Sequence, residues 1–340
     1  MRVAVDAHNL LADRRGIGVA VRAVLAQWLA NAACDLTLLV RHPLPRLQKA
    51  ALARELDTDA FTVAGRVPRD SDAVWHPWNG TFFDARNVPA VATVHDVAPF
   101  AFPADDVRRR ASEQEPFRRT ARTARRILAD SLFTKSEIVR YLDVKPERIA
   151  HVALAADERY TRGTPESLPE MLRDRRYVVY VGAIEHRKNT QTLIAAWRAA
   201  FPTGDVALAI VSSQNVPPDV VALRDLSVER LRDVYRGASA VACPSTYEGF
   251  GLPPLEALAC GTPAVVSRAA SLPEVCGDAA LYVDEPLNVA QWSAALQRIV
   301  SDDALRTALQ TAGLQQASRF SWQATACQTL SALESVSADA

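Results

Sequence analysis

The stretch from Cys243 to Thr262 carries the residue types best suited to chemistry. Two glutamates, Glu248 and Glu256, flank a loop that contains two glycines, Gly249-Phe-Gly-Leu252. Carboxylates repel anions but accept hydrogen bonds from hydroxyls. The free amides of a loop that opens a helix, in contrast, attract anions. A ligand that combines a phosphate with sugar hydroxyls would satisfy both kinds of group.

The two glutamates differ in their expected roles. The Pro253-Pro254 pair predicts the first turn of a helix, and Gly261 followed by Pro263 predicts its end. Glu256 would then lie in the first turn, where an acid stabilises a helix by up to about 1 kcal/mol without any ligand. Glu248 precedes a glycine in a loop and has no such role. We therefore expect Glu248 to be the better candidate for a sugar contact.

Positive charge for a phosphate is expected from Arg187-Lys188. This pair follows a buried strand at 177–182 and opens a helix at 190–200. Cations at this end of a helix oppose its dipole, so they lower stability unless an anion compensates. Arginine supplies a planar fork and lysine a point charge, which together suit a diphosphate. A solvated surface pair is the alternative, but the glutamate-flanked loop favours phosphate binding.

Two N-terminal features also indicate ligand binding. His95-Asp96 ends an apolar strand at 88–96, and ligands of parallel sheets gather at the carboxyl ends of the strands. A structural histidine is the alternative interpretation. Gly16-Ile-Gly18 is expected in a loop between a strand at 2–6 and a helix at 19–29, where glycine lets the backbone approach a ligand closely.

Strands and helices alternate along most of the chain, which predicts a doubly wound α/β fold with parallel sheets. Residues 161–175 interrupt the alternation, which restarts with the strand at 177–182. We therefore expect two Rossmann-like domains, at 1–165 and 166–318, and a C-terminal helix at 319–340.

The 340-residue chain has a formal net charge of zero, but the charge is unevenly distributed. Residues 1–165 carry 25 Lys and Arg against 20 Asp and Glu, and the remainder carries 14 against 19. Much of the N-terminal excess lies at Arg108–Arg126, in a helical stretch that Pro116 is expected to interrupt. A solvated helix face is one interpretation. The other is attraction to an anionic membrane surface or a phosphate-bearing acceptor.

Cysteine usage and the N-terminus indicate the compartment. The five cysteines are scattered without a CxxC pair, which predicts buried free thiols in a reducing environment. The strand at 2–6 leaves no room for a signal peptide, and no apolar run approaches the ~20 residues that a membrane span needs. We expect a cytoplasmic protein, with peripheral contact at the inner face of the membrane through the basic region, and no nucleic-acid partner.

These residues together resemble a known family. The chain is similar to the family 4 retaining glycosyltransferases, in which two Rossmann-like domains face each other across a cleft, the GT-B architecture. Glu248–Glu256 resembles the family's E-x7-E motif, and Val181–Asn189 its G-x-x-x-x-R-K-N turn. Further segments that resemble family motifs are Ala259–Pro263, Gly16–Gly18, His95-Asp96 and Asp130–Lys135. The resemblance runs over nearly the whole chain. It implies that the domain at 1–165 is the acceptor-side domain and that the domain at 166–318 binds the nucleotide-sugar donor.

The resemblance implies a role for each motif. Arg187 and Lys188 would hold the diphosphate of a nucleotide sugar, Glu248 and Glu256 would accept from its sugar and ribose hydroxyls, and the last helix, around Trp322, would cross back to the N-terminal domain. The implied catalytic residues are His95, Arg187, Lys188 and Glu248. The implied residues that bind the sugar donor are Gly16, Gly18, Gly182, Asn189, Gly249, Phe250, Gly251, Leu252 and Glu256. Of these, Gly16, Gly18 and His95 would close over the sugar donor from the other domain.

No metal or other cofactor is expected. Asp57-Thr-Asp59 and Asp70-Ser-Asp72 match the DxD pattern with which some glycosyltransferases hold Mn²⁺, but both lie in polar turns and are interpreted as turn and capping residues. The six histidines show no HxH or HExxH spacing. The resemblance implies front-face substitution without a covalent enzyme intermediate, in which Arg, Lys and a helix end stabilise the leaving diphosphate.

The sequences of the Gly-Ile-Gly and Arg-Lys-Asn motifs most resemble those of the bacterial mannosyl- and rhamnosyl-transferases of O-antigen and exopolysaccharide assembly. This implies GDP-mannose or a related GDP-sugar as donor, and a glycan or lipid-linked saccharide as acceptor. Residues 214–225 depart from the family pattern, because they are short and interrupted by proline. Three alternatives stay open: a UDP-sugar-dependent transferase, a nucleotide-sugar 2-epimerase on the same architecture, and a sugar-nucleotide-binding protein without catalysis.

Overall fold

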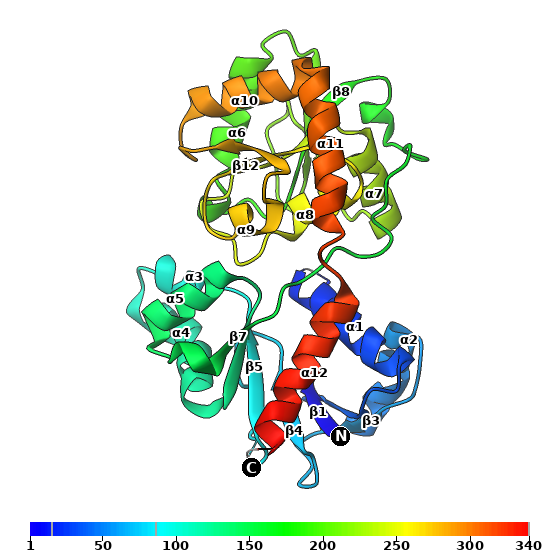
Figure 1. The fold of residues 1–340 in the computed structure, drawn as a ribbon, viewed down its shortest axis with the longest axis vertical. Coiled ribbons are helices and arrows are strands. Elements are labelled where there is room, and N and C mark those ends of the chain that lie inside the picture. The colour runs from blue at the N-terminus through cyan, green and yellow to red at the C-terminus, as the bar shows by residue number, and fades with distance from the viewer. Residues whose placement is uncertain (15, 86, 339–340) are drawn as a thin grey trace. The chain divides into compact units, whose positions relative to one another are not determined.

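The computed structural model describes residues 1–14, 16–85 and 87–338. The chain divides into two compact units (Figure 1). The N-terminal unit comprises Met1–Leu154 and Ser321–Ala340, and the C-terminal unit comprises Ala155–Phe320. Each unit is built around one parallel sheet with helices packed on it, which confirms the predicted class of two Rossmann-like α/β units.

The N-terminal unit contains a seven-stranded sheet in the order β3-β2-β1-β4-β5-β6-β7. The chain builds the sheet outward from β1 on one side and then, from β4, on the other. Such a switch point gathers ligands at the carboxyl ends of its two strands. The strands are β1 (Arg2–Asp6), β2 (Asp35–Leu39), β3 (Thr62–Ala64), β4 (Ala73–His76), β5 (Ala90–Val94), β6 (Arg126–Ala129) and β7 (Ile149–His151).

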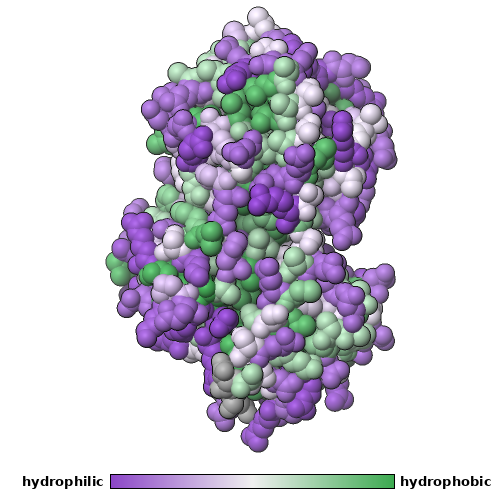
Figure 2. Space-filling model, viewed as in Figure 1, coloured by the Kyte–Doolittle hydropathy of each residue, from purple (hydrophilic) through white to green (hydrophobic). Residues whose placement is uncertain are grey.

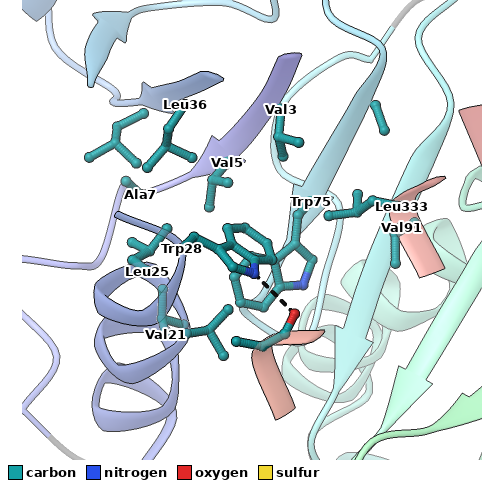
Figure 3. Packing of buried hydrophobic residues seen from close by; sticks show 14 of the residues in the cluster. Val3, Val5, Ala7, Val21, Leu25, Trp28, Leu36, Trp75, Val91 and Leu333 are labelled. Carbon is teal, nitrogen blue, oxygen red and sulfur yellow. Dashed lines mark hydrogen bonds between the residues drawn. The ribbon is translucent and has the colours of Figure 1, made fainter. Parts of the chain in front are cut away.

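The last helix of the chain, α12 (Trp322–Ala338), packs on the N-terminal unit. The indole Nε1 of Trp28 donates to the carbonyl oxygen of Ala326 at 3.0 Å, and Leu333 is fully buried in the same apolar cluster (Figure 3). The other helices of this unit are α1 (Gly16–Ala30), η1 (Pro45–Gln48), α2 (Lys49–Leu56), α3 (Ala98–Ala101), α4 (Val107–Thr123), α5 (Leu132–Leu142) and η2 (Pro146–Arg148).

Two of these helices differ from the expected bounds. Helix α1 begins at Gly16 instead of residue 19, so Gly16 and Gly18 lie in its first turn and not in a preceding loop. Helix α4 runs without a break, with Pro116 inside it. Phe117 and Thr120 of α4 are buried, and their packing offsets the ~3 kcal/mol that an internal proline costs.

The C-terminal unit contains a six-stranded sheet in the order β10-β9-β8-β11-β12-β13, with its switch point between β8 and β11. The strands are β8 (Arg176–Val181), β9 (Val206–Val211), β10 (Val221–Leu223), β11 (Ala240–Cys243), β12 (Ala264–Ser267) and β13 (Ala280–Val283). The helices are η3 (Glu170–Leu172), η4 (His186–Lys188), α6 (Thr190–Ala200), α7 (Val228–Gly237), α8 (Leu252–Ala259), α9 (Leu272–Cys276), α10 (Val289–Ser301) and α11 (Asp303–Ala317).

Both faces of this second sheet are covered, because its strands are apolar on both sides. Trp292 and Leu296 of α10 are fully buried in the cluster on one face, together with Leu193 of α6. Tyr235 of α7 and Leu258 of α8 are fully buried in the cluster on the other. This packing holds β8 and β11 side by side and so determines where the loops that follow them begin.

The boundary between the units falls before Ala155, earlier than the expected boundary at 165/166. The ring of Tyr160 lies edge-on to Tyr235, with 5.8 Å between the ring centroids. The guanidinium of Arg236 donates to the carbonyl oxygen of Thr161 at 2.8 Å. These contacts attach residues 155–165 to the C-terminal unit, although the composition of 161–175 predicts a linker.

The cysteines are free thiols, and three of them, Cys243, Cys260 and Cys276, are buried as expected. The expectation of burial is wrong for Cys327, which is exposed on α12, and Cys34 is partly buried. Within the described residues, no helix is both long and apolar enough to cross a membrane.

Candidate active site

Two loops meet at the carboxyl edge of the C-terminal sheet, one after β8 and one after β11. The two strands are hydrogen-bonded neighbours, with Val178 opposite Ala240. The loop after β8 carries Arg187 and Lys188, and the loop after β11 carries Glu248. The candidate cations and the candidate carboxylate are therefore gathered at the switch point, where parallel α/β sheets bind their ligands.

Gly182 lets the chain leave β8 sharply. Its φ of 149° is a conformation that residues with a side chain rarely adopt. The hydroxyl of Tyr180 donates to the carbonyl oxygen of Ala183 at 2.7 Å, and a Cβ on Gly182 would lie 3.1 Å from that hydroxyl. The predicted glycine is thus required by the backbone of the turn, and its contact with a sugar donor stays a prediction.

Asn189 separates the short helix η4 from α6. Its backbone is left-handed, with φ of 52°. Its side-chain amide donates to the carbonyl oxygens of Pro244 at 3.2 Å and Pro286 at 2.6 Å, and its Oδ1 accepts from the hydroxyl of Thr192. Asn189 therefore ties the turn to the loop that follows β11. Arg187 and Lys188 lie in η4, in the turn that leads into α6, as expected.

Lys188 and Glu248 form the central interaction of the site. The Nζ atom of Lys188 lies 2.6 Å from Oε1 and 2.7 Å from Oε2 of Glu248. The hydroxyl of Ser245 also donates to Oε1, at 2.6 Å. Lys188 is the only lysine in the C-terminal unit, whose other basic residues are arginine and histidine. A compact ammonium can contact both oxygens of one carboxylate and still keep a third N–H.

Glu248 stays charged although its side chain is only 10% exposed. Burial alone would raise the pKa of Glu248, but the charge and hydrogen bonds of Lys188, the Ser245 hydroxyl and the nearby Arg187 together lower it below its usual 4.5. The bonds from Lys188 and Ser245 leave part of the acceptor capacity of Oε2 unused. A hydroxyl of a ligand can therefore donate to Glu248 without breaking the ion pair.

Arg187 lies beside this pair. Its Nη1 is 4.0 Å from Oε2 of Glu248, and its Nε is 3.1 Å from a carboxylate oxygen of Glu185. The backbone of Arg187 is held by Thr246, whose N–H donates to the Arg187 carbonyl at 2.8 Å. The guanidinium and the ammonium together place two positive charges at the edge of the sheet, which is the arrangement that a diphosphate needs.

The loop after Glu248 is held by Ser271. Its hydroxyl lies 2.9 Å from the carbonyl oxygen of Glu248 and 2.6 Å from that of Phe250. Gly251 has φ of 113°, and the ring of Phe250 packs edge-on against Phe320 within the same unit. The side chain of Phe250 is therefore buried, so Phe250 can contact a ligand only through its backbone.

Helix α8 begins at Leu252, one residue before the expected start. Pro253 and Pro254 follow in its first turn and have no N–H. Among the described residues, none accepts a hydrogen bond from the amides of Phe250, Gly251 and Leu252. Free amides at the positive end of a helix dipole are suited to bind an anion.

Glu256 lies in the second turn of α8, so the expectation of a first-turn acid is wrong. The helix dipole therefore does not explain this residue. The hydroxyl of Tyr235 donates to its Oε2 at 3.0 Å. Burial raises the pKa of Glu256 to about 7, with only the Tyr235 hydrogen bond opposing the rise. Such a carboxyl changes protonation near neutral pH, which is typical of functional sites.

His95 belongs to the N-terminal unit, and both nitrogens of its ring are hydrogen-bonded within the protein. Its Nδ1 lies 2.6 Å from a carboxylate oxygen of Asp130, and its Nε2 lies 2.8 Å from the carbonyl oxygen of Pro77. Both partners are acceptors, so both ring nitrogens donate. Burial alone would lower the pKa of His95, but Asp130 and the Pro77 carbonyl raise it. A contact between this ring and a substrate, which stays a prediction, would replace one of these two bonds.

Gly18 is required by packing within its own unit. A Cβ on Gly18 would lie 2.0 Å from the carbonyl oxygen of Asp13. Arg22, one turn further along α1, donates to the same oxygen at 2.6 Å. Gly16 is exposed at the first position of α1. The proposed contacts of Gly16 and Gly18 with the sugar donor remain predictions.

The two DxD segments behave as turn residues. Asp57 ends α2 in the left-handed conformation, with φ of 52°. Asp70 and Asp72 both pair with the exposed Arg2. In the part of the chain that the structure describes, no three His, Cys, Asp or Glu side chains are arranged to hold a metal ion.

Three residues of the site were missed by sequence reasoning, namely Ser245, Ser271 and Tyr235. Each acts through a partner brought close by the sheet or by helix packing. Ser245 lies three residues before Glu248 and is the one that a local pattern might have indicated. Ser271 and Tyr235 are separated from their partners by about 20 residues and carry no motif of their own.

Comparison with known proteins identifies the family and the fold of the chain. The family described as "Glycosyl transferases group 1" matches residues 169–316. The O-antigen chain mannosyltransferase B of Escherichia coli is 34% identical over 283 residues, which cover 77% of this chain and 74% of that protein. The D-inositol 3-phosphate glycosyltransferase of Rhodococcus opacus is 30% identical over 273 residues, covering 72% of this chain and 61% of that protein. Anabaena HepE, solved with UDP and glucose, has a TM-score of 0.75 at 13% identity, covering 98% and 100% of the two chains.

The two parallel α/β units match structures of the GT-B glycosyltransferases over nearly their whole length. The identity to the mannosyltransferase extends through both units and includes the segment that holds Lys188 and Glu248. The chain belongs to the group 1 glycosyltransferase family.

The ion pair at the centre of the site predicts a distinctive pattern of stabilities. Lys188→Met should lower the free energy of unfolding by about 3–5 kcal/mol, because it leaves the Glu248 carboxylate buried without its partner. The double variant Lys188→Met/Glu248→Gln should recover part of that loss. Because the pKa of Glu248 is lowered, the pair's contribution is present above pH 4.5 and is lost as the pH falls through the folded-state pKa.

Urea denaturation of the wild-type protein, the Lys188→Met and Glu248→Gln single variants and the double variant measures these differences. Arg198→Met is the matched control, since it breaks an exposed pair with Asp219 in the same unit and should change stability little. Additive effects of the two substitutions at 188 and 248 would contradict the coupling.

Proposed function

We propose that the protein is a retaining, metal-independent hexosyltransferase that moves mannose, or a closely related sugar, from a GDP-sugar to a saccharide acceptor of cell-surface polysaccharide synthesis. The cluster of Lys188, Arg187 and Glu248 at the switch point of the C-terminal sheet is the observation that carries this proposal. The match to a mannosyltransferase of O-antigen synthesis supports the choice of sugar.

The proposed site divides the work among its residues. The third N–H of Lys188, the guanidinium of Arg187 and the amides of Phe250–Leu252 stabilise the negative charge that develops on the leaving diphosphate. Glu248 accepts a hydrogen bond from a hydroxyl of the transferred sugar. Glu256 accepts from a ribose hydroxyl. Gly182, Gly249 and Gly251 let the backbone come close to these groups.

The proposed reaction is a substitution on one face of the sugar. The bond between the anomeric carbon and the diphosphate oxygen breaks, and the acceptor hydroxyl forms its bond to that carbon from the same side. The proton of the hydroxyl passes to the departing diphosphate. Positive charge from Lys188 and Arg187 performs the task that a divalent metal performs in other transferases, so the reaction is expected to need none.

Two enzymatic alternatives lead to different products. A UDP-sugar-dependent transferase is the alternative that the fold of HepE, which was solved with UDP, supports. A nucleotide-sugar 2-epimerase would release an epimer without transfer. A binding protein without catalysis would release no nucleotide.

A donor panel tests the function directly. The full chain is incubated with GDP-mannose, GDP-fucose, UDP-glucose and UDP-N-acetylglucosamine, with and without methyl glycoside acceptors, in EDTA. We expect transfer from GDP-mannose. NMR of the product measures its anomeric configuration, which should be retained. Glu248→Ala and Lys188→Ala should each lower turnover at least a hundredfold, the scale of one charge-stabilising group at about 2.7 kcal/mol.

Glu285→Ala, an exposed glutamate of the same unit, is the control and should keep its turnover. Epimer formation without transfer, activity that requires added metal, or wild-type turnover in either site variant would overturn the assignment.

The proposed ribose contact predicts proton release on nucleotide binding. With a pKa of about 7, Glu256 is largely protonated at pH 6. Hydroxyl donors favour the charged form, so binding should release a proton, and affinity should rise with pH between 4.5 and 7. Calorimetry of GDP binding at pH 6, in two buffers of different ionisation enthalpy, measures the release. Glu256→Gln should abolish it, and equal proton release in both proteins would exclude this role.

The N-terminal unit supplies a basic face for a membrane. Exposed arginines lie along α4, and exposed apolar residues lie beside its start and that of α5. Two of the arginines pair with Glu113 and Glu115, but the balance on α4 stays positive. Figure 2 shows mainly hydrophilic side chains over this part of the unit, with hydrophobic ones among them. The exposed residues are Phe102, Val107, Arg108, Arg109, Arg118, Arg119, Arg122 and Leu132.

This face is proposed to contact the anionic inner surface of the cytoplasmic membrane, where a lipid-linked acceptor would be presented. Sedimentation with vesicles of phosphatidylglycerol should show binding that weakens as salt is added. Arg118→Glu/Arg119→Glu should weaken it, whereas Arg175→Glu/Arg176→Glu, on the C-terminal unit, should not. Equal binding to neutral phosphatidylcholine vesicles would contradict an electrostatic contact.

A further inference from the structure

A second polar cluster lies at the switch point of the N-terminal sheet. Asp6 is the last residue of β1, His76 is the last residue of β4, and both are fully buried. His8 follows Asp6 by two residues at the same edge. The sheet order makes β1 and β4 parallel, hydrogen-bonded neighbours, and the chain continues from β1 toward one edge of the sheet and from β4 toward the other. The carboxyl ends of such a pair are where parallel sheets bind ligands.

His8 is held rigidly by this cluster. Its Nδ1 lies 2.6 Å from Oδ1 of Asp6, and the same oxygen accepts from its backbone N–H at 3.1 Å. Its ring lies against Trp78 and Phe82, with 6.0 Å and 5.0 Å between centroids. Because Nδ1–H points to the carboxylate, Nε2 of the neutral ring is an acceptor. No described residue is hydrogen-bonded to Nε2.

The cluster contains buried polar atoms that destabilise the fold because they lack hydrogen-bond partners. Neither ring nitrogen of His76 has a hydrogen-bond partner among the described residues, and its Nδ1 lies 3.6 Å from Oδ2 of Asp6. Each such buried group costs about 1–3 kcal/mol. Burial alone would raise the pKa of Asp6, but His76 and His8 lower it, so Asp6 remains a carboxylate. The buried carboxylate of Asp6 therefore fixes the orientation of the His8 ring.

The surroundings of His8 indicate the chemistry of its ligand. The Asp6 carboxylate directly behind the ring disfavours an anionic ligand at this point. The guanidinium of Arg41, just beyond the end of β2, lies 5.2 Å from the centre of the Phe82 ring and donates to the Phe82 carbonyl at 3.1 Å. Arg41 is exposed and has further N–H groups. An acceptor on His8 and donors on Arg41 match a neutral molecule with neighbouring hydroxyls.

We propose that His8, oriented by Asp6 and His76, binds a hydroxyl of the saccharide acceptor through Nε2. This inference rests on the proposed function, since it assigns the acceptor side of that reaction to the N-terminal unit. His8 is a substrate-binding residue in this account, and the bond it makes is an ordinary hydrogen bond with no proton transfer. None of the motifs in the sequence includes His8 or His76.

The test compares acceptor and donor kinetics in the full chain. Transfer from the donor-panel sugar is measured with the methyl glycosides of mannose, rhamnose, glucose and galactose. His8→Ala should raise the KM for the acceptor about tenfold or more, the scale of one hydrogen bond. The KM for the sugar donor and the slow hydrolysis of the donor without acceptor should stay unchanged. His42→Ala, at a half-buried histidine just beyond β2, is the matched control.

A second measurement uses the wild-type protein and does not depend on a variant that folds. The protein is labelled with ¹⁵N-histidine and titrated with the best methyl glycoside. The Nε2 resonance of His8, assigned by its loss in His8→Gln, should shift with the acceptor concentration.

The outcomes separate the two proposals. An unchanged acceptor KM in His8→Ala, shifts confined to other histidines, or donor hydrolysis without transfer to any methyl glycoside would overturn the acceptor site and leave the donor site standing. Absence of both transfer and hydrolysis in the wild-type protein would overturn the proposed function instead.

Discussion

The buried ion pair between Lys188 and Glu248 is the interaction on which the candidate site depends. Burying both charges costs several kcal/mol, which good geometry and further hydrogen bonds must offset. Here the ammonium contacts both carboxylate oxygens, and Ser245 donates to one of them. Gly182 and Asn189 bring the lysine to the carboxyl edge of the sheet, and Ser271 holds the backbone on the far side of Glu248. The fold of the C-terminal unit thus serves to join two loops.

The pair also explains how one site can address a phosphate and a sugar. Lys188 keeps one N–H and Glu248 keeps part of its acceptor capacity, so a cation and an anion are presented side by side in fixed orientation. Groups fixed in this way need no reorganisation when charge develops on a leaving diphosphate. The amides at the start of α8 add a third, neutral source of positive potential. Glu256, in the next turn of α8, differs from Glu248 because burial raises the pKa of its carboxyl to about 7, so it changes protonation near neutral pH.

Sequence patterns predicted the fold class and the turn and loop that carry Lys188 and Glu248, because strands, glycine turns and proline-started helices are local signals. They predicted poorly where tertiary packing decides. Helix α4 continues through Pro116 because its buried face packs well, and Gly18 lies inside α1, where the carbonyl oxygen of Asp13 leaves no room for a Cβ. The partners of His95 follow the two strands on either side of its own, and Tyr235 reaches Glu256 from another helix. No spacing in the sequence records such neighbours.

The proposed function requires that the Lys188–Glu248 pair hold the diphosphate end of a nucleotide sugar. Crystal structures of the full chain grown with GDP and with UDP test it most directly. The account predicts a diphosphate within hydrogen-bond distance of Lys188 Nζ and of the amides of Phe250–Leu252, with Glu256 at the ribose. A diphosphate bound elsewhere, with the Lys188–Glu248 pair untouched, would contradict it.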